Sequence, residues 1–498
     1  MQPAFRLPDD LLDHLPAQEN GIGIWVVGGA IRDHLLGRHY SDLDFVVSEN
    51  AVELARTLAN RLDWDFFVLD AERGAARILP RQSGQPIDRI DFSTIRGQDV
   101  EEDLKHRYFT INALAMNVYE LSKLIDPTNG IQDLRSGVLR PCSPSSLKDD
   151  PVRVIRAVRF ATQLEFKLDA DAIAQVNAAV GGLSDVSAER IRDELFRILN
   201  GINVATAIRL LDHLHILEVL FPDIVGLKRA INGGTSTPTE WEIRLAQFRD
   251  MKQIVDILRR KHDPEAAADA VWGSLSLKLG RYREQISDFL DTSMTDARTR
   301  SSLCFFTLLG LPVEVDDEAA FDLDSAQIER GIEVQSLKDS LLKRSRAFRL
   351  SGEESEFIRR TAAGYLTLET IPDPDYLSDL ELHRFYRDFG VGGVSAALLY
   401  LSRATAIAAG PPDADSWERR LTSVRLLWEA FFDRYGVVIE PPVLLNGSDL
   451  MEEFNLAPGP RIGMLLDALR EAQVVGQVRT RQEAFDFIRE LRLRGNSS

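Results

Sequence analysis

The chain has few cysteines and no long apolar segment. Only two cysteines, Cys142 and Cys304, occur among its 498 residues, and neither lies at a zinc-type spacing. Two such cysteines cannot form a disulfide framework, which fits a reducing compartment. No apolar run approaches membrane-spanning length, and the N-terminus lacks a signal-peptide pattern. We therefore expect a cytoplasmic protein without a membrane partner.

Positive charge is also scarce, since the formal net charge is −18. This balance argues against a general nucleic-acid coat protein, because phosphate contacts normally call for a basic surface. No DNA partner is expected. A local basic stripe for RNA remains available, unless some of its members are only solvated helix-face charges; it comprises Arg135, Arg140, Lys148, Arg153, Arg156 and Arg159.

The chain has only eight histidines, and they do not suggest a metal site. His262-Asp263 precedes Pro264 and a helical pattern, so Asp263 is interpreted as a helix N-cap rather than a metal ligand. His383 is the only histidine further on. His213 and His215 lie beside apolar residues and are interpreted as core or helix-end histidines. A metal site needs several converging ligands, which these do not supply.

Residues 24–47 carry the most informative pattern of the chain. An apolar run leads into Gly28-Gly29, a short helical pattern follows, and Asp42-Leu43-Asp44 then begins a second apolar run. In a strand, residues i and i+2 point to the same face, so Asp42 and Asp44 aim two carboxylates at one place. Hard oxygen ligands of this kind suit Mg²⁺. The glycine pair leaves backbone N–H groups open to a phosphate, which predicts a site for two-metal nucleotidyl transfer.

Five motifs in order resemble one known family. They are Gly28-Gly29-Ala30-Ile31-Arg32-Asp33 with Asp42-Leu43-Asp44, then segments 103–113, 126–134, 149–160 and 188–195. Together they are similar to the class II tRNA nucleotidyltransferases and bacterial poly(A) polymerases, within the polymerase-beta-like superfamily. The resemblance covers roughly the first 200 residues strongly and the remainder more weakly. This family usually has Asp at the position of Tyr108.

The resemblance implies an α+β fold, with a polymerase-beta-like nucleotidyltransferase head followed by an all-helical neck, body and tail. We place these parts at residues 1–140, 141–225, 226–415 and 416–498. Period-two patterns predict strands, and three- to four-residue spacing predicts helices. The strands are expected at 25–28, 44–47, 65–69, 76–79 and 87–93, and the helices at 52–62, 151–164, 170–180, 188–199, 203–213, 240–258, 264–277 and 462–472. In the tail, Pro458-Gly459-Pro460 is interpreted equally well as a capping turn or as an RNA phosphate contact.

The resemblance also assigns an enzyme activity and site residues. It implies transfer of CMP or AMP from CTP or ATP to the 3′ end of tRNA, with Mg²⁺ held by Asp42 and Asp44. Asp91, on the strand pattern 90–93, is a candidate third catalytic carboxylate; its alternative is a solvent-facing strand residue. The nucleotide-binding candidates are Gly28, Gly29, Arg32, Arg107, Asn112, Asp150, Arg153, Arg156 and Arg159.

Asp150 and Arg153 are the candidates for choosing the base. Their carboxylate and guanidinium would complement the exocyclic amine and the neighbouring acceptor of cytosine or adenine, and would mismatch uracil and guanine. The alternative is an acidic cap with an exposed helix ion pair, which contributes only about 0.3–0.5 kcal/mol. Because Arg156 and Arg159 drift around the helix, we expect them to reach phosphates instead.

Only a short segment, Gly97 to Glu102, joins the Asp91 strand to the next motif. Many relatives that build the complete CCA end carry a loop of tens of residues there. A pocket that cannot be reshaped should add one kind of nucleotide, so we expect partial CCA synthesis, with a mild preference for A over CC. The alternatives are a poly(A) polymerase and a non-catalytic RNA-binding protein.

Overall fold

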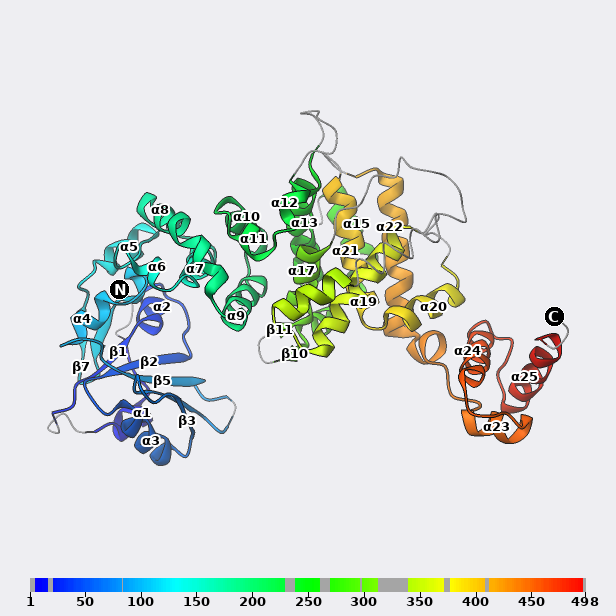
Figure 1. Ribbon diagram of the computed structural model, residues 1–498, viewed down its shortest axis with the longest axis horizontal. Coiled ribbons are helices and arrows are strands. Elements are labelled where there is room, and N and C mark those ends of the chain that lie inside the picture. The colour runs from blue at the N-terminus through cyan, green and yellow to red at the C-terminus, as the bar shows by residue number, and fades with distance from the viewer. Residues whose placement is uncertain are drawn as a thin grey trace. The chain divides into compact units, whose positions relative to one another are not determined.

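A computed structural model describes residues 5–16, 21–82, 84–228, 238–259, 269–295, 298–311, 339–370, 377–407 and 412–495. The chain divides into two compact units. The first comprises residues 1–194 and 210–220, and the second comprises residues 195–209 and 221–498. Figure 1 gives the element labels used below.

A seven-stranded sheet forms the centre of the first unit, in the order β3-β4-β5-β2-β1-β6-β7. Neighbouring strands are antiparallel except for β2 and β5, which are parallel. The bounds are β1 Ile24–Val27, β2 Asp42–Val47, β3 Asp65–Asp70, β4 Ala75–Leu79, β5 Arg89–Thr94, β6 Ala115–Asn117 and β7 Glu120–Ile125. A parallel pair needs a crossover connection, which α3 (Ala51–Leu62) and the β3–β4 hairpin supply here.

The two faces of this sheet are covered by different helices. On one face, α3 packs against β4 and β5 and buries Leu54, Ala55 and Leu58. On the other face, α4 (Val100–Lys105) packs Val100 and Leu104 against the apolar cluster around Val27 and Val46. Apolar residues at three- and four-residue spacing explain both contacts. The remaining helices of the sheet region are α1 (Asp9–His14) and α2 (Gly29–Leu35).

Helices follow the sheet along the chain. They are α5 (Gly130–Ser136), α6 (Ser146–Asp149), α7 (Arg153–Leu164), α8 (Ala170–Ala179), α9 (Ala188–Leu199), α10 (Val204–His213) and α11 (Ile216–Leu220). Two short parallel strands, β8 (Val138–Leu139) and β9 (Lys167–Leu168), join this region. His213 and His215 are exposed at the end of α10, which agrees with the helix-end interpretation.

The second unit is helical around a buried central helix, α21 (Gly392–Ile407), which packs against α13 and α19. Its other main helices are α12 (Ile224–Leu227), α13 (Glu240–Arg259), α15 (Ala270–Leu279), α16 (Arg283–Asp291), α17 (Arg300–Gly310), α19 (Gly352–Glu369), α20 (Asp379–Phe389) and α22 (Ala414–Trp428), with a short hairpin of β10 (Ser293–Thr295) and β11 (Arg298–Thr299). At Gly392 a Cβ atom would lie 2.8 Å from the Thr361 backbone nitrogen, so α21 approaches α19 closely there.

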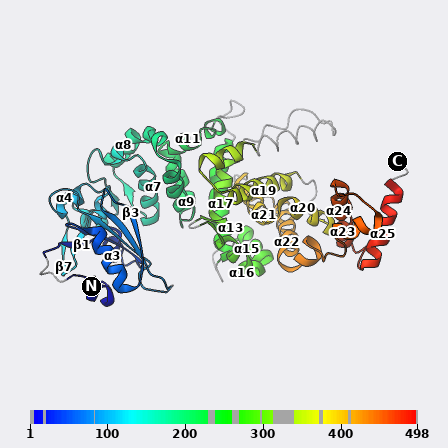
Figure 2. The same ribbon diagram turned by 60° about the horizontal axis from the view of Figure 1, so that its bottom comes forward.

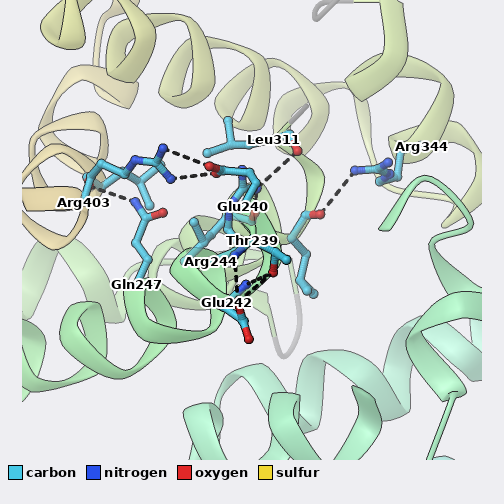
Figure 3. Close-up of polar contacts among 11 residues, drawn as sticks. Thr239, Glu240, Glu242, Arg244, Gln247, Leu311, Arg344 and Arg403 are labelled. Carbon is cyan, nitrogen blue, oxygen red and sulfur yellow. Dashed lines mark hydrogen bonds and ion pairs between the residues drawn. The ribbon is translucent and has the colours of Figure 1, made fainter. Parts of the chain in front are cut away.

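A buried ion-pair network ties three of these helices together. The carboxylate of Glu240 on α13 accepts two hydrogen bonds from Arg403 on α21, at 2.6 and 3.0 Å (Figure 3). Arg244, also on α13, donates to the same carboxylate at 3.3 Å and to the Leu308 carbonyl of α17 at 2.7 Å. All three charged side chains are at most 9% exposed, and each charge therefore depends on the others for compensation.

The C-terminal segment has a small apolar core of its own. Figure 2 shows α23 (Gly447–Phe454), α24 (Pro460–Val474) and α25 (Arg481–Gly495) grouped together. Leu450, Leu469 and Ile488 are among the residues buried between them. Two π-helical turns, 429–433 and 435–439, lead into this segment.

The structure confirms the α+β fold class, and the predicted elements appear with small shifts. α9 spans the predicted residues, while α7 begins at Arg153 rather than at residue 151 because Asp150 is extended. The expected helix at 264–277 is observed from Ala270, and its start, with His262-Asp263, lies outside the described residues. Within the described ranges no single helix is long and apolar enough to cross a membrane, although the bent pair α20–α21 meets that test by length and composition.

Candidate active site

Three predicted carboxylates lie on one face of the sheet. Asp42 and Asp44 alternate on β2, and Asp44 pairs in register with Asp91 on the parallel neighbour β5. In-register neighbours project their side chains to the same face. The spacing of Asp42 and Asp44 predicted that they share a face, and the parallel pairing of β2 with β5 places Asp91 on that face as well.

Two arginines that the sequence analysis did not single out contact these carboxylates. Arg77 on β4 donates to both oxygens of Asp91, at 2.7 and 2.9 Å. Arg89 on β5 pairs with Asp42, and its Nε also lies 3.8 Å from Asp91. Arg77 and Arg89 are each the single arginine of their strand, and their partners depend on the strand order.

Burial dominates the electrostatics of Asp44. It raises the pKa of this carboxyl above its ordinary value, and the neighbouring charges of Asp91 and Asp42 add to the rise. Arg107 and Arg89 act in the opposite direction without cancelling it. The pKa of Asp42 is raised too, again first by burial. A cation bound between these two carboxyls would favour their ionised forms, because it would offset their burial and their mutual repulsion.

The turn after β1 approaches this acidic face closely. Gly28 has φ +77°, a conformation that favours glycine. A Cβ atom there would lie 3.4 Å from Nη1 of Arg107 and 3.7 Å from Oδ2 of Asp44. Gly28 therefore leaves the space between the Asp44 carboxylate and the Arg107 guanidinium clear of side-chain atoms.

Arg32 and Asn112 form a buried polar pair behind this turn. Arg32 donates to Oδ1 of Asn112 at 2.6 Å and also pairs with Asp33. Asn112 is only 3% exposed, and its Nδ2 has no hydrogen-bond partner among the described residues. A buried amide donor without a partner is costly, which fits a group reserved for a ligand.

Arg107 is held by a residue that the sequence analysis did not assign to the site. Asp103, 5% exposed on α4, accepts from Nε of Arg107 at 3.3 Å and from the Arg96 backbone N–H at 3.0 Å. Asp103 was visible within the second motif. Its role as a support depends on the helical i, i+4 spacing to Arg107.

Asp150 and Arg153 lie near each other at the start of α7. Their closest charged atoms are 3.6 Å apart, and Arg190 of α9 donates to Asp150 at 2.7 Å. Asp150, Arg153 and Arg190 line a cleft of about 1470 Å³, whose other wall includes Thr94 and Arg96 at the end of β5. Arg190 is a further residue that the sequence analysis did not assign.

Arg156 and Arg159 converge on a different partner. Their Nε atoms donate to the two oxygens of Glu194, at 2.8 and 2.9 Å. Glu194 is 2% exposed, so it fixes both guanidiniums from α9. Their predicted contact with a nucleotide stays a prediction, and any such contact would use guanidinium nitrogens other than Nε.

Tyr108, where the resembled family usually has Asp, joins the aromatic side of this region. Its ring stacks with Phe160 at 6.2 Å, and the guanidiniums of Arg153 and Arg156 lie 5.8 and 5.5 Å from its centroid. Cations over an aromatic face are attracted by its quadrupole. The Tyr108 ring thus contacts both guanidiniums through cation–π interactions, whereas an Asp at this position would form an ion pair with an arginine.

The carboxylates fit a cation that a substrate helps to bind. Among the described residues, no three His, Cys, Asp or Glu side chains converge closely enough to hold a metal ion. Mg²⁺ commonly takes one or two carboxylates together with substrate phosphates, and Asp42 and Asp44 would supply the carboxylates.

His383 is buried, and its ring contacts the Val438 carbonyl at 2.8 Å, so it has a structural role.

Comparison with known proteins fits this geometry. Residues 24–140 match the poly A polymerase head domain, residues 165–227 match the probable RNA and SrmB-binding site of polymerase A, and residues 440–488 match the putative domain 2 of tRNA nucleotidyltransferases. A CC-adding tRNA nucleotidyltransferase of Geobacter sulfurreducens is 31% identical over 96% of this chain and 94% of its own. The chain belongs to the tRNA nucleotidyltransferase and poly(A) polymerase family. It is therefore a nucleotidyltransferase, as predicted.

Other members of the family are similar over nearly the whole chain. An A-adding tRNA nucleotidyltransferase of Deinococcus radiodurans is 29% identical over 94% of this chain and 95% of its own. The solved Thermotoga maritima CCA-adding enzyme complexed with tRNA is 19% identical, covers 98% of both chains and has a TM-score of 0.57. That structure supports the same fold.

Proposed function

We propose that this protein adds CMP or AMP from CTP or ATP to the 3′ end of tRNA and releases pyrophosphate. The observation that carries the proposal is the placement of Asp42, Asp44 and Asp91 on one sheet face, directly beside the Gly28 turn and Arg107. Near full-length similarity to tRNA nucleotidyltransferases favours this function over poly(A) synthesis.

The residues divide the work of phosphoryl transfer. Asp42 and Asp44 would hold Mg²⁺, which when bound lowers the pKa of the attacking 3′-hydroxyl and neutralises the triphosphate. Gly28 and Gly29 leave room for the triphosphate, while Arg32 and Arg107 supply fixed positive charge and Asn112 supplies its unpartnered N–H. Arg77 keeps Asp91 oriented toward Asp44 through two hydrogen bonds.

Asp150 and Arg153 would select the base in the cleft above the end of β5. The Asp150 carboxylate accepts from the exocyclic amine of cytosine or adenine, and Arg153 donates to the neighbouring ring acceptor. Arg190 holds the Asp150 carboxylate at 2.7 Å, so the acceptor is fixed before the nucleotide arrives. Uracil and guanine present a carbonyl where this edge needs a donor.

We further propose that the enzyme builds only part of the CCA end, with a preference for A. Only residues 95–99 separate β5 from α4. This connection is tied down, because Asp99 accepts from the Glu102 backbone N–H at 2.8 Å and Glu102 accepts from the Gln98 N–H at 2.7 Å. A short capped connection cannot change its conformation as a long mobile loop can. The nucleotide pocket should therefore keep one shape and accept one kind of base well.

Three tRNA substrates test both levels of the proposal. Purified protein with Mg²⁺ is given tRNA ending before CCA, tRNA ending in CC, or complete tRNA, with each labelled nucleoside triphosphate in turn. We expect A addition to tRNA ending in CC to exceed C addition to tRNA ending before CCA. CC addition alone would overturn the preference for A, and efficient synthesis of all three nucleotides would overturn partial activity.

A catalytic control separates the activity from contamination. Asp42→Ala or Asp44→Ala should lower incorporation by orders of magnitude, because each change removes a carboxylate that holds the catalytic ion. Near-normal incorporation by either variant would contradict the proposed site.

A further inference from the structure

Strand β3 exposes three consecutive apolar side chains at the edge of the sheet. Phe67, Val68 and Leu69 are 49%, 45% and 51% exposed. β3 pairs only with β4, so it is the last strand on that side. Single exposed apolar side chains are common on protein surfaces, so the position of Phe67 in the sheet matters more than its exposure.

The register places Phe67 on the same face as the carboxylates. Phe67 pairs with Arg77 on β4, Arg77 pairs with Asp91 on β5, and Asp91 pairs with Asp44 on β2. The Arg77–Asp91 hydrogen bonds show that two members of this row do share a face. Phe67, Arg77, Asp91 and Asp44 therefore form one cross-strand row.

Val68 belongs to the opposite face. It pairs with the buried Ala76, and its neighbour Phe66 pairs with the buried Ile78. The guanidinium of Arg56, on α3, lies 4.9 Å from the Phe66 ring. Val68 is thus about as exposed as Phe67 but lies on the opposite face of the sheet from the carboxylates.

The row places an exposed aromatic ring beside an arginine, and both kinds of side chain occur in single-stranded nucleic-acid sites. Proteins bind unpaired strands by stacking bases on aromatic rings beside cationic side chains. Arg77 lies between Phe67 and the carboxylates, and Arg81 and Arg73 accompany Asp65 and Asp70 at the two ends of β3. Three strand spacings of about 4.8 Å put Phe67 about 14 Å from Asp44.

We propose that Phe67 is a stacking platform for an unpaired base of the RNA acceptor end, a few positions upstream of the reacting 3′ nucleotide. This inference rests on the proposed RNA 3′-end transfer. The RNA backbone would cross the sheet along the row, with its 3′-hydroxyl at Asp42 and Asp44. The platform is continuous with the carboxylate face, which favours RNA over a protein occupant. Asp65 and Asp70 flank the strand, and such charges discourage strand addition by a second copy.

The test compares Phe67→Ser with the matched control Val68→Ser, which removes an equally exposed apolar side chain from the other face. The KM for acceptor tRNA should rise about 5- to 150-fold in Phe67→Ser, the range for losing one stacked base, while the KM for the nucleotide changes less than twofold. Val68→Ser should change neither constant, and Phe67→Tyr should restore the affinity because its ring also stacks. Circular dichroism checks that each variant is folded.

An abasic substitution at each unpaired 3′ position identifies the base. At one position the abasic tRNA should weaken binding to the wild type and to Val68→Ser but cause no further loss with Phe67→Ser. Equal KM values for wild type and Phe67→Ser, or equal losses in both serine variants, would overturn the platform. A change in oligomeric state in Phe67→Ser would overturn it in favour of a protein contact. Absence of transfer by the wild type would instead refute the proposed function.

Discussion

Asp44 carries an electrostatic cost that belongs to a single residue. Burial raises the pKa of its carboxyl, so the folded head holds the proton more tightly than the unfolded chain does. Stability therefore falls as the pH rises from the ordinary value near 3.8 through the folded pKa, and the cost is fully present above it.

We predict that Asp44→Asn stabilises the metal-free protein at neutral pH, because the amide removes the cost of keeping a buried carboxylate charged. We expect Mg²⁺ to raise the melting temperature of the wild type, because an ion that binds only the folded state stabilises it, and we expect this rise to be lost in the variant. Thermal melts in chelator and in Mg²⁺ measure both effects.

Asp65→Asn is the control, because Asp65 on β3 is half exposed. It should keep the response to Mg²⁺. A Mg²⁺ response that survives in Asp44→Asn would contradict the proposed metal ligand.

At the scale of elements, the Glu240 network joins α13 to α21 and α17. Burial alone would raise the pKa of Glu240, but the hydrogen bonds and charge of Arg403, with the charge of Arg244, outweigh it and lower that pKa. The stability from this pairing is present above about pH 4.5 and is lost as the pH falls through the folded pKa.

We predict that Glu240→Gln costs roughly 3–5 kcal/mol at pH 7, because two buried guanidiniums lose their counter-charge. The difference from the wild type should narrow as the pH falls below about 4.5. Hydrogen exchange of the α13 and α21 amides reports this opening directly.

Glu356→Gln offers a comparison within the same unit. Glu356 on α19 also pairs with two arginines, Arg359 and Arg360, but its side chain is 42% exposed. Exposed pairs contribute about 0–1 kcal/mol. Similar losses in the two variants would show that burial does not set the strength of the Glu240 network.

Local patterns predicted the elements better than they predicted the partners. Alternation placed Asp42 and Asp44 on one face, and helical spacing located α3 and α9. The strand β6 escaped notice because three residues carry too little periodicity.

The partners depend on tertiary structure that no local pattern contains. The contacts of Arg77 and Arg89 require the order β4-β5-β2, and the hold of Glu194 on Arg156 and Arg159 requires α9 to return to α7. Spacing predicted only that Arg156 and Arg159 point away from Arg153, and their meeting on the Glu194 carboxylate depends on α9.

The whole molecule carries excess negative charge, so its contact with RNA should depend on a few local features. The tail has its own core, and residues 457–461 at the start of α24, including Gly459 and Arg461, are exposed. Gly459 caps α24 and Pro460 is its first residue, which agrees with the capping turn, while a contact of this exposed turn with RNA stays a prediction.

We predict that deleting residues 440–498 raises the KM for tRNA at least tenfold and changes the KM for the nucleotide less than twofold. Arg461→Glu should give part of that loss and a weaker salt dependence, because it removes a phosphate contact without removing the tail. Steady-state kinetics at two salt concentrations check both. Unchanged tRNA kinetics in the deletion would contradict a tail contact.

The parallel pairing of β2 with β5 has a consequence for how the enzyme comes into being. Arg89 and Asp42 lie 47 residues apart in sequence, and a helix and a hairpin must be in place before their strands can meet. Closing so long a loop is entropically unfavourable, and non-local parallel pairing is intrinsically slow to form. A nascent chain that has emerged only as far as β4 thus contains Asp42 and Asp44 but lacks Asp91, so the proposed site is incomplete. Recovery of activity after dilution from denaturant should consequently lag behind the recovery of helix content, because formation of the β2–β5 pair limits the rate at which active protein appears.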